Sequence, residues 1–153
     1  MDNAENAYHE SHKPGLLDRK LLEMIAHAAD GETAAVKYYT RLSDMLEGAD
    51  KKTVHNIALD EAKHRRLYEE LYFNIAGTRM LPPHTPPEPV EPKGSLHEIF
   101  EERLHDELSD VEFYRQIYQA LLNLDYRDIL FEIITDELRH ANLMSQLYAK
   151  YKA

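Results

Sequence analysis

The chain has 153 residues, with 18 basic and 28 acidic side chains, and its formal net charge of −10 argues against a nucleic-acid-binding surface. It contains no cysteine, which excludes disulfides, thiolate catalysis, zinc ribbons and iron–sulfur clusters. The length predicts one domain over residues 1–153, and no apolar run approaches the ~18 residues of a membrane span. The polar first residues do not resemble a signal peptide, so we expect a cytoplasmic protein.

Apolar residues in the first half recur every three or four positions, which is the period of a helix rather than a strand. One apolar stripe covers Leu17–Leu46, and Gly48 and Asp50 predict the end of this helix and the N-cap of the next. A second stripe covers Val54–Ile75. We therefore expect two long helices, preceded by an N-terminal arm over residues 1–14.

A proline-rich segment, residues 77–94, follows the second stripe and predicts a linker. Two antiparallel neighbouring helices need only a short loop. In extended polyproline form, at ~3.1 Å per residue, this segment would span about 55 Å. A helix of about 27 residues is only ~40 Å long. The linker therefore predicts a crossover that runs the full length of the helices.

The second half also predicts two helices. Ser95 and Glu98 form a Ser-x-x-Glu capping box in front of a third apolar stripe, Leu96–Leu121. Asp125 is the predicted N-cap of a fourth helix, whose stripe covers Leu130–Tyr151. The sequence thus predicts an all-α four-helix bundle with one long crossover between helices two and three.

Polar residues interrupt each apolar stripe at positions that the helical period places in the core. A buried ionised carboxylate costs several kcal/mol unless it is neutralised. No matching set of Lys or Arg occupies the same phase, so metal ions are the simplest compensation. The core-phase polar residues, which we predict to be metal ligands, are Glu32, Glu61, His64, Glu107, Glu137 and His140.

The spacing of these residues supports a pair of metal ions. The segments Glu61–His64 and Glu137–His140 are both Glu-x-x-His, which places the two side chains on one helix face. Two such motifs, with one further Glu from each of two other helices, are the ligand arrangement of di-iron and di-manganese carboxylate proteins. A shift of 76 residues superposes the two motifs, and a shift of 75 superposes Glu32 on Glu107. We expect two ions per chain, iron first, while manganese and zinc accept the same ligands.

Two aspartates and two tyrosines accompany these ligands. Asp60 and Asp136 directly precede the glutamate of each motif. We expect each to reach across to a histidine and fix its tautomer, the alternative being plain surface charges. Tyr39 and Tyr114 lie seven residues after Glu32 and Glu107 respectively. They either act near the metals, by a hydrogen bond or an electron relay, or simply pack in the core.

These motifs resemble those of the rubrerythrin family within the ferritin-like superfamily, from the first helix to the end of the fourth. The resemblance implies that Glu61 and Glu137 bridge two irons and that the other four ligands each bind one. It further implies that hydrogen peroxide is reduced to water by iron that cycles between the diferrous and diferric states. The segments that carry the resemblance are Glu32, Asp60-Glu61-x-x-His64, Glu107 and Asp136-Glu137-x-Arg139-His140.

The sequence departs from this family in two respects. Rubrerythrins usually carry a rubredoxin domain with four cysteines, and this sequence has no cysteine. We therefore expect an external electron donor, such as a separate rubredoxin or a flavoprotein. The family also has an extra Glu three residues after the third-helix ligand, where this chain has the shorter Asp110, a candidate extra metal ligand. Related bundles pair their helices, so we also expect a homodimer.

Three functions stay open at the level of the sequence. The first is a di-iron peroxidase, the second a ferroxidase or iron-binding protein that uses O₂, and the third a metal-binding helical bundle without turnover. Storage ferritins usually lack the second Glu-x-x-His, and bacterioferritins bind haem through a methionine of helix two, where this sequence has none. Rates with peroxide and with O₂ separate the first two functions, and metal content tests the third.

Overall fold

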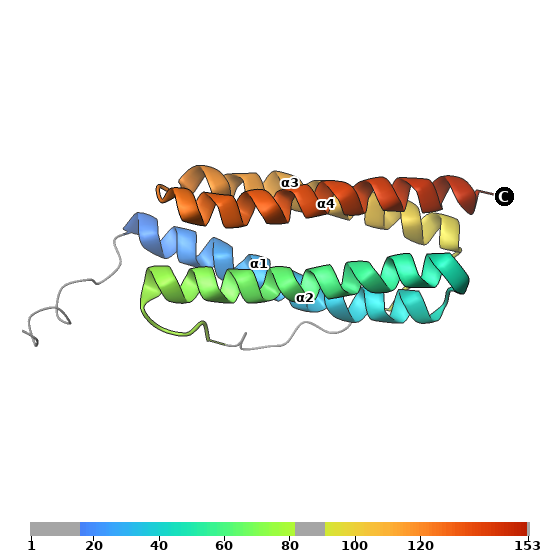
Figure 1. The fold of residues 1–153 in the computed structure, drawn as a ribbon, viewed down its shortest axis with the longest axis horizontal. Coiled ribbons are helices and arrows are strands. Elements are labelled where there is room, and N and C mark those ends of the chain that lie inside the picture. Colours follow the sequence, from blue (N-terminus) through green and yellow to red (C-terminus); the bar gives the residue numbers. More distant parts are fainter. Residues whose placement is uncertain (1–15, 82–90, 153) are drawn as a thin grey trace, which may run out of the picture.

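The computed structural model describes residues 16–81 and 91–152, which form four helices and no strand. They are α1 (Leu16–Asp44), α2 (Gly48–Ala76), α3 (Leu96–Ala120) and α4 (Leu124–Lys150). α1 packs mainly against α2, and α3 packs mainly against α4, so two helical hairpins lie against each other (Figure 1). This confirms the predicted all-α four-helix bundle. Among the described helices, none is long and apolar enough to cross a membrane.

The direction of the helices confirms the long crossover. α2 ends at the end of the bundle where α1 begins, whereas α3 begins at the opposite end (Figure 1). The chain between them must therefore travel the length of the bundle, as the proline-rich linker predicts. Residues 82–90, which form the middle of that linker, and the predicted arm over residues 1–14 lie outside the described residues.

Two of the predicted helix caps are wrong by a few residues. The N-cap of α2 is Glu47, and the N-cap of α4 is Asn123, whose side chain accepts from the backbone N–H of Asp125. Asp50 and Asp125 lie instead in the first turn of their helices. Acidic residues are favoured both at the cap and in the first turn, because both face the positive end of the helix dipole. The Ser95–Glu98 capping box forms as predicted.

The core consists of two apolar clusters, one toward each end of the bundle. Along α1, Ala28 belongs to the first cluster and Tyr39 to the second, and Glu32 lies between them. Along α2 the order is reversed, with Ile57 in the second cluster and Tyr68 in the first. A layer of polar side chains therefore divides the core near the middle of the bundle.

Candidate metal centre

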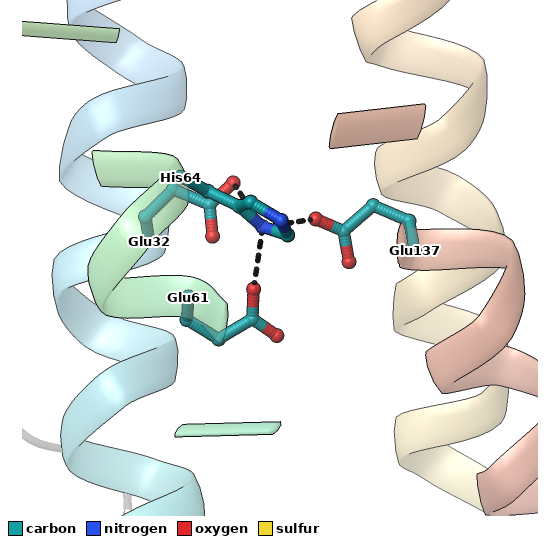
Figure 2. Close-up of side chains that lie close together, drawn as sticks. All are labelled: Glu32, Glu61, His64 and Glu137. Carbon is teal, nitrogen blue, oxygen red and sulfur yellow. Dashed lines mark hydrogen bonds and ion pairs between the residues drawn. The ribbon is translucent and has the colours of Figure 1, made fainter. Parts of the chain in front are cut away.

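The six predicted ligands meet in this polar layer. α1 contributes Glu32, α3 contributes Glu107, and α2 and α4 each contribute the Glu and His of one Glu-x-x-His motif. All six side chains are buried, and even the most accessible of them, Glu107, is only 4% exposed. Figure 2 shows Glu32, Glu61, His64 and Glu137, and in it Glu137 of α4 reaches across to the imidazole of His64 on α2.

The six residues form two overlapping groups. Each group offers one ligand atom per residue, and within a group these atoms all lie within 4.8 Å of one another. Glu61 and Glu137 belong to both groups, which is the position that a bridging carboxylate requires. The groups are Glu32, Glu61, His64 and Glu137, and Glu61, Glu107, Glu137 and His140.

Both histidines aim the same nitrogen at the carboxylates. His64 Nδ1 lies 3.0 Å from Glu61 Oε2 and 3.0 Å from Glu137 Oε1. His140 Nδ1 lies 3.2 Å from Glu137 Oε2, 3.3 Å from Glu61 Oε1 and 3.5 Å from Glu107 Oε2. Each Nδ1 thus faces more carboxylate oxygens than a single N–H can donate to. A metal ion in place of that proton can bind Nδ1 and these oxygens together.

The hydrogen-bond balance of the cluster leads to the same conclusion. Glu107 Oε2 and Glu137 Oε1 are buried, and neither accepts a hydrogen bond of favourable geometry from a described residue, although His140 Nδ1 lies 3.5 Å from the first and His64 Nδ1 3.0 Å from the second. A buried acceptor without a donor costs about 1–3 kcal/mol. The side chains therefore fit a pair of divalent cations, and their mixture of carboxylate oxygen and imidazole nitrogen suits iron, manganese or zinc.

Protons partly neutralise this charge in the metal-free cluster. Burial and the neighbouring carboxylates raise the pKa of Glu32 well above its usual range. Burial, opposed by His140, raises the pKa of Glu107 to about 7. Burial disfavours the charged form of His64, but the carboxylates of Glu137 and Glu61 outweigh burial and raise the pKa of His64 to about 11. The cluster therefore attracts positive charge, as protons or as metal ions.

The two aspartates of the motifs each contact the histidine of the opposite helix. His64 Nε2 lies 3.1 Å from Asp136 Oδ2, and His140 Nε2 lies 3.2 Å from Asp60 Oδ2. Burial works against the ionised form of Asp136, but hydrogen bonds from His64 and Lys63 prevail and lower its pKa. A carboxylate that accepts from Nε2–H leaves the lone pair of Nδ1 free for a metal.

We expect Asp136→Asn to weaken metal binding ten- to a hundredfold, the usual cost of losing such a hydrogen-bond partner of a ligand. Competition with a chromophoric chelator measures the affinity. Glu132→Gln is the matched control, because Glu132 lies on the same helix and contacts Lys63 but not His64. An affinity of Asp136→Asn equal to that of the control would show that Asp136 is only a surface charge.

Both tyrosines donate hydrogen bonds across the bundle to the cluster. Tyr114 Oη on α3 lies 2.6 Å from Glu32 Oε1 on α1, and Tyr39 on α1 donates to Glu107 Oε1 on α3. Each hydroxyl holds the carboxylate of the other hairpin, so the two contacts follow the internal repeat of the sequence. Of the two roles that the sequence left open for these tyrosines, the contacts agree with hydrogen bonding near the metal ligands rather than with packing alone.

The sequence pattern of the family described as Rubrerythrin matches residues 23–148, which include every residue of the cluster. The chain belongs to the rubrerythrin family. This membership and the carboxylate–histidine cluster together indicate a two-metal site for which iron is the expected metal.

The chain is also similar to individual known proteins. The YhjR protein of Bacillus subtilis (strain 168) is 27% identical over 125 residues, which are 81% of this chain and 83% of that protein. The bacterioferritin of Desulfovibrio desulfuricans, whose structure describes a diiron site, is similar with a TM-score of 0.72 and 18% identity, over 87% of this chain and 80% of that one. A ferritin-like, diiron-carboxylate protein from Bacillus anthracis str. Ames has a TM-score of 0.67 and 18% identity, over 88% of this chain and 99% of that one. The two structural likenesses show the ferritin-like fold.

A cavity of about 360 Å³ connects this rubrerythrin-type cluster with the surface. It lies between α1 and α3, and its lining includes the four buried carboxylates together with the exposed residues Gly31, Glu102 and Asp110. Asp110, the candidate extra ligand, therefore lies at the outer part of the cavity, and it belongs to neither four-residue group. A small molecule can reach the cluster by this route.

Two cations that the sequence pattern did not assign to the site hold the aspartates in place. Lys63 Nζ lies 3.0 Å from Asp136 Oδ2, and Arg139 contacts both aspartates at 2.8 Å. Lys63 and Arg139 are separated by 76 residues, like the two motifs. Each directly precedes a ligand histidine at the same position of the repeat. That repeated position is the signal from which their contacts with Asp60 and Asp136 could have been predicted.

Proposed function

We propose that this protein reduces hydrogen peroxide to water at a pair of iron ions, with electrons from a separate donor. The observation that carries the proposal is the doubled cluster, in which two carboxylates belong to both metal-binding groups and a cavity reaches them from the surface. Membership of the rubrerythrin family supports the choice of peroxide. A bound iron pair would supply two electrons, one from each ion.

The chain itself positions the ligands and holds protons. Glu61 and Glu137 would bridge the ions, while Glu32 and Glu107 would each bind one, and each of the last two is fixed by a tyrosine hydroxyl. Reduction of one peroxide to two waters takes up two electrons and two protons. Tyr39 lines the cavity, so its hydroxyl holds a proton where the oxidant arrives. The electrons would come from a rubredoxin or a flavoprotein, and we place the reaction in the cytoplasm.

A ferroxidase is the second candidate, and the charge of the cavity favours it. The outer lining includes Glu102, Asp106 and Asp110, in addition to the carboxylates of the cluster. Arg103, which pairs with Glu102 and Asp106, is the one cation among the described residues of the lining, so carboxylates outnumber cations there. An acidic passage attracts cations and would guide Fe²⁺ inward. In that case O₂ would be the oxidant and iron would leave the site after oxidation.

Anaerobic stopped-flow absorbance separates these candidates. The protein is loaded with two Fe²⁺ per chain and mixed with one equivalent of hydrogen peroxide, and the experiment is repeated with O₂. A peroxidase oxidises the iron much faster with peroxide. Equal or faster oxidation by O₂ would support the ferroxidase instead, and no oxidation by either would leave a metal-binding bundle without turnover.

The cavity gives a prediction about Gly31, an exposed residue of α1 at its rim. A Cβ built on Gly31 meets no atom within 4 Å, so a side chain can be accommodated there. Gly31→Ala and Gly31→Leu should both stabilise the helix by up to ~1 kcal/mol. Only the longer Leu side chain can obstruct the cavity, so only Gly31→Leu should slow oxidation by peroxide, at unchanged metal content. Equal rates for the two variants would show that the oxidant uses another route.

A further inference from the structure

A second surface feature lies close to the cluster, on the outer face of the α1–α2 hairpin. It is a groove of about 310 Å³ whose lining includes Thr33 and Lys37 from α1 and Ala62, Arg65 and Arg66 from α2. The cavity that reaches the carboxylates lies between α1 and α3 instead. A partner in the groove would therefore leave the cavity open.

The groove is basic, although the whole chain carries a formal net charge of −10. Lys37, Arg65 and Arg66 are exposed, and Glu69 is the one acidic residue among the described residues that line the groove. Arg65 pairs with Glu69 at 3.0 Å, while Lys37 and Arg66 form no ion pair with any described residue. Two cations are thus left to face solvent, where they can attract an acidic partner.

The groove also lies directly behind the metal-binding residues. Thr33 follows Glu32 in the chain, Ala62 follows Glu61, and Arg65 follows His64. Neighbouring positions of a helix point in different directions, so the ligands face the core while their neighbours face the groove. At these three positions, a residue that lines the groove is therefore bonded directly to a residue of the metal-binding cluster.

We propose that this groove is the docking site of the electron donor, a small acidic protein that carries one electron. The proposal rests on the proposed function, since it assigns the place where the reductant of that reaction binds. Two carrier molecules, each giving up one electron, would return the oxidised metal pair to the reduced state. The oxidant would use the α1–α3 cavity, so donor and oxidant would not compete for one surface.

Charge reversal in the groove tests this docking site. The double variant Lys37→Glu/Arg66→Glu is compared with Arg115→Glu, an exposed arginine of α3 outside the groove. The oxidised, iron-loaded proteins are mixed in stopped flow with reduced rubredoxin of net negative charge, and separately with reduced methyl viologen. At low ionic strength the groove variant should react with rubredoxin at least roughly tenfold more slowly than the wild-type protein, because electrostatic steering changes association rates by this order.

Three further results are expected if the groove binds the donor. High salt should remove the difference between the variants, because exposed charges are screened. The rates with methyl viologen and the rate of Arg115→Glu with rubredoxin should stay unchanged. NMR titration of the metal-free protein with zinc-substituted rubredoxin should shift the backbone amide signals of residues 33–37 and 62–69.

The proposal is overturned if the groove variant and Arg115→Glu reduce equally fast, or if the NMR shifts fall on another face. Reduction of the wild-type protein by methyl viologen but not by rubredoxin would also overturn it. A diferrous protein that hydrogen peroxide does not oxidise would refute the proposed function. The NMR titration would still decide the docking site, because it needs neither iron nor turnover.

Discussion

Replacing Glu137 with alanine is expected to abolish the two-metal site. Glu137 is 2% exposed, belongs to both four-residue groups, and lies within 3.2 Å of the Nδ1 atoms of both histidines. Its loss removes one ligand from each ion at once. We expect Glu137→Ala to lose at least one metal ion per chain and all absorbance of an iron pair, as measured by metal analysis and spectroscopy after dialysis.

Glu107→Ala provides a graded comparison, because Glu107 belongs to only one of the two groups. It should retain more metal than Glu137→Ala. Circular dichroism and gel filtration establish that both variants fold. A normal two-metal complement in folded Glu137→Ala would refute its position between the ions.

The stability of the metal-free protein should fall as the pH rises from 5 to 9. The pKa of Glu107 is about 7 in the folded protein against a usual 4.5, so the stability it contributes below pH 4.5 is lost between 4.5 and 7. The pKa of His64 is about 11 against a usual 6.5, so its contribution is lost from pH 6.5 upward. At about 1.4 kcal/mol per pKa unit, the free energy of unfolding should fall by an amount on the order of 3 kcal/mol or more.

Urea unfolding across this pH range measures the effect, with the manganese-loaded protein as the comparison. Metal ions displace the protons from the histidines and carboxylates, and they bind more tightly as the pH rises. The loaded protein should therefore be more stable than the metal-free protein, by a margin that grows toward pH 9. A metal-free protein whose stability increases with pH would show that the cluster does not hold these protons.

The sequence predicts the fold and the members of the cluster well because both follow from one periodicity. Apolar residues at helical spacing define the buried face, so a glutamate in the same phase, such as Glu32 or Glu107, must be buried too. The structure brings all six such residues together, within two groups of 4.8 Å. The repeat of 76 residues adds the pseudo-twofold relation between His64 and His140.

Other features could not be predicted because they depend on how the helices lie beside each other. The period shows that Lys63 faces away from the core, but not that it contacts Asp136 on α4. It likewise places Lys37 and Arg66 on the surface, but not on one groove. The helix caps were missed for a local reason, since Asp50 and Asp125 suit a first turn as well as a cap.

Anomalous X-ray diffraction from crystals of the iron-loaded protein tests the two-metal site most directly. Data collected at the iron absorption edge should show two peaks inside the bundle. One should lie among Glu32, Glu61, His64 and Glu137, and the other among Glu61, Glu107, Glu137 and His140. A single peak in the cluster, or peaks elsewhere on the protein, would contradict a paired metal centre built from these six residues.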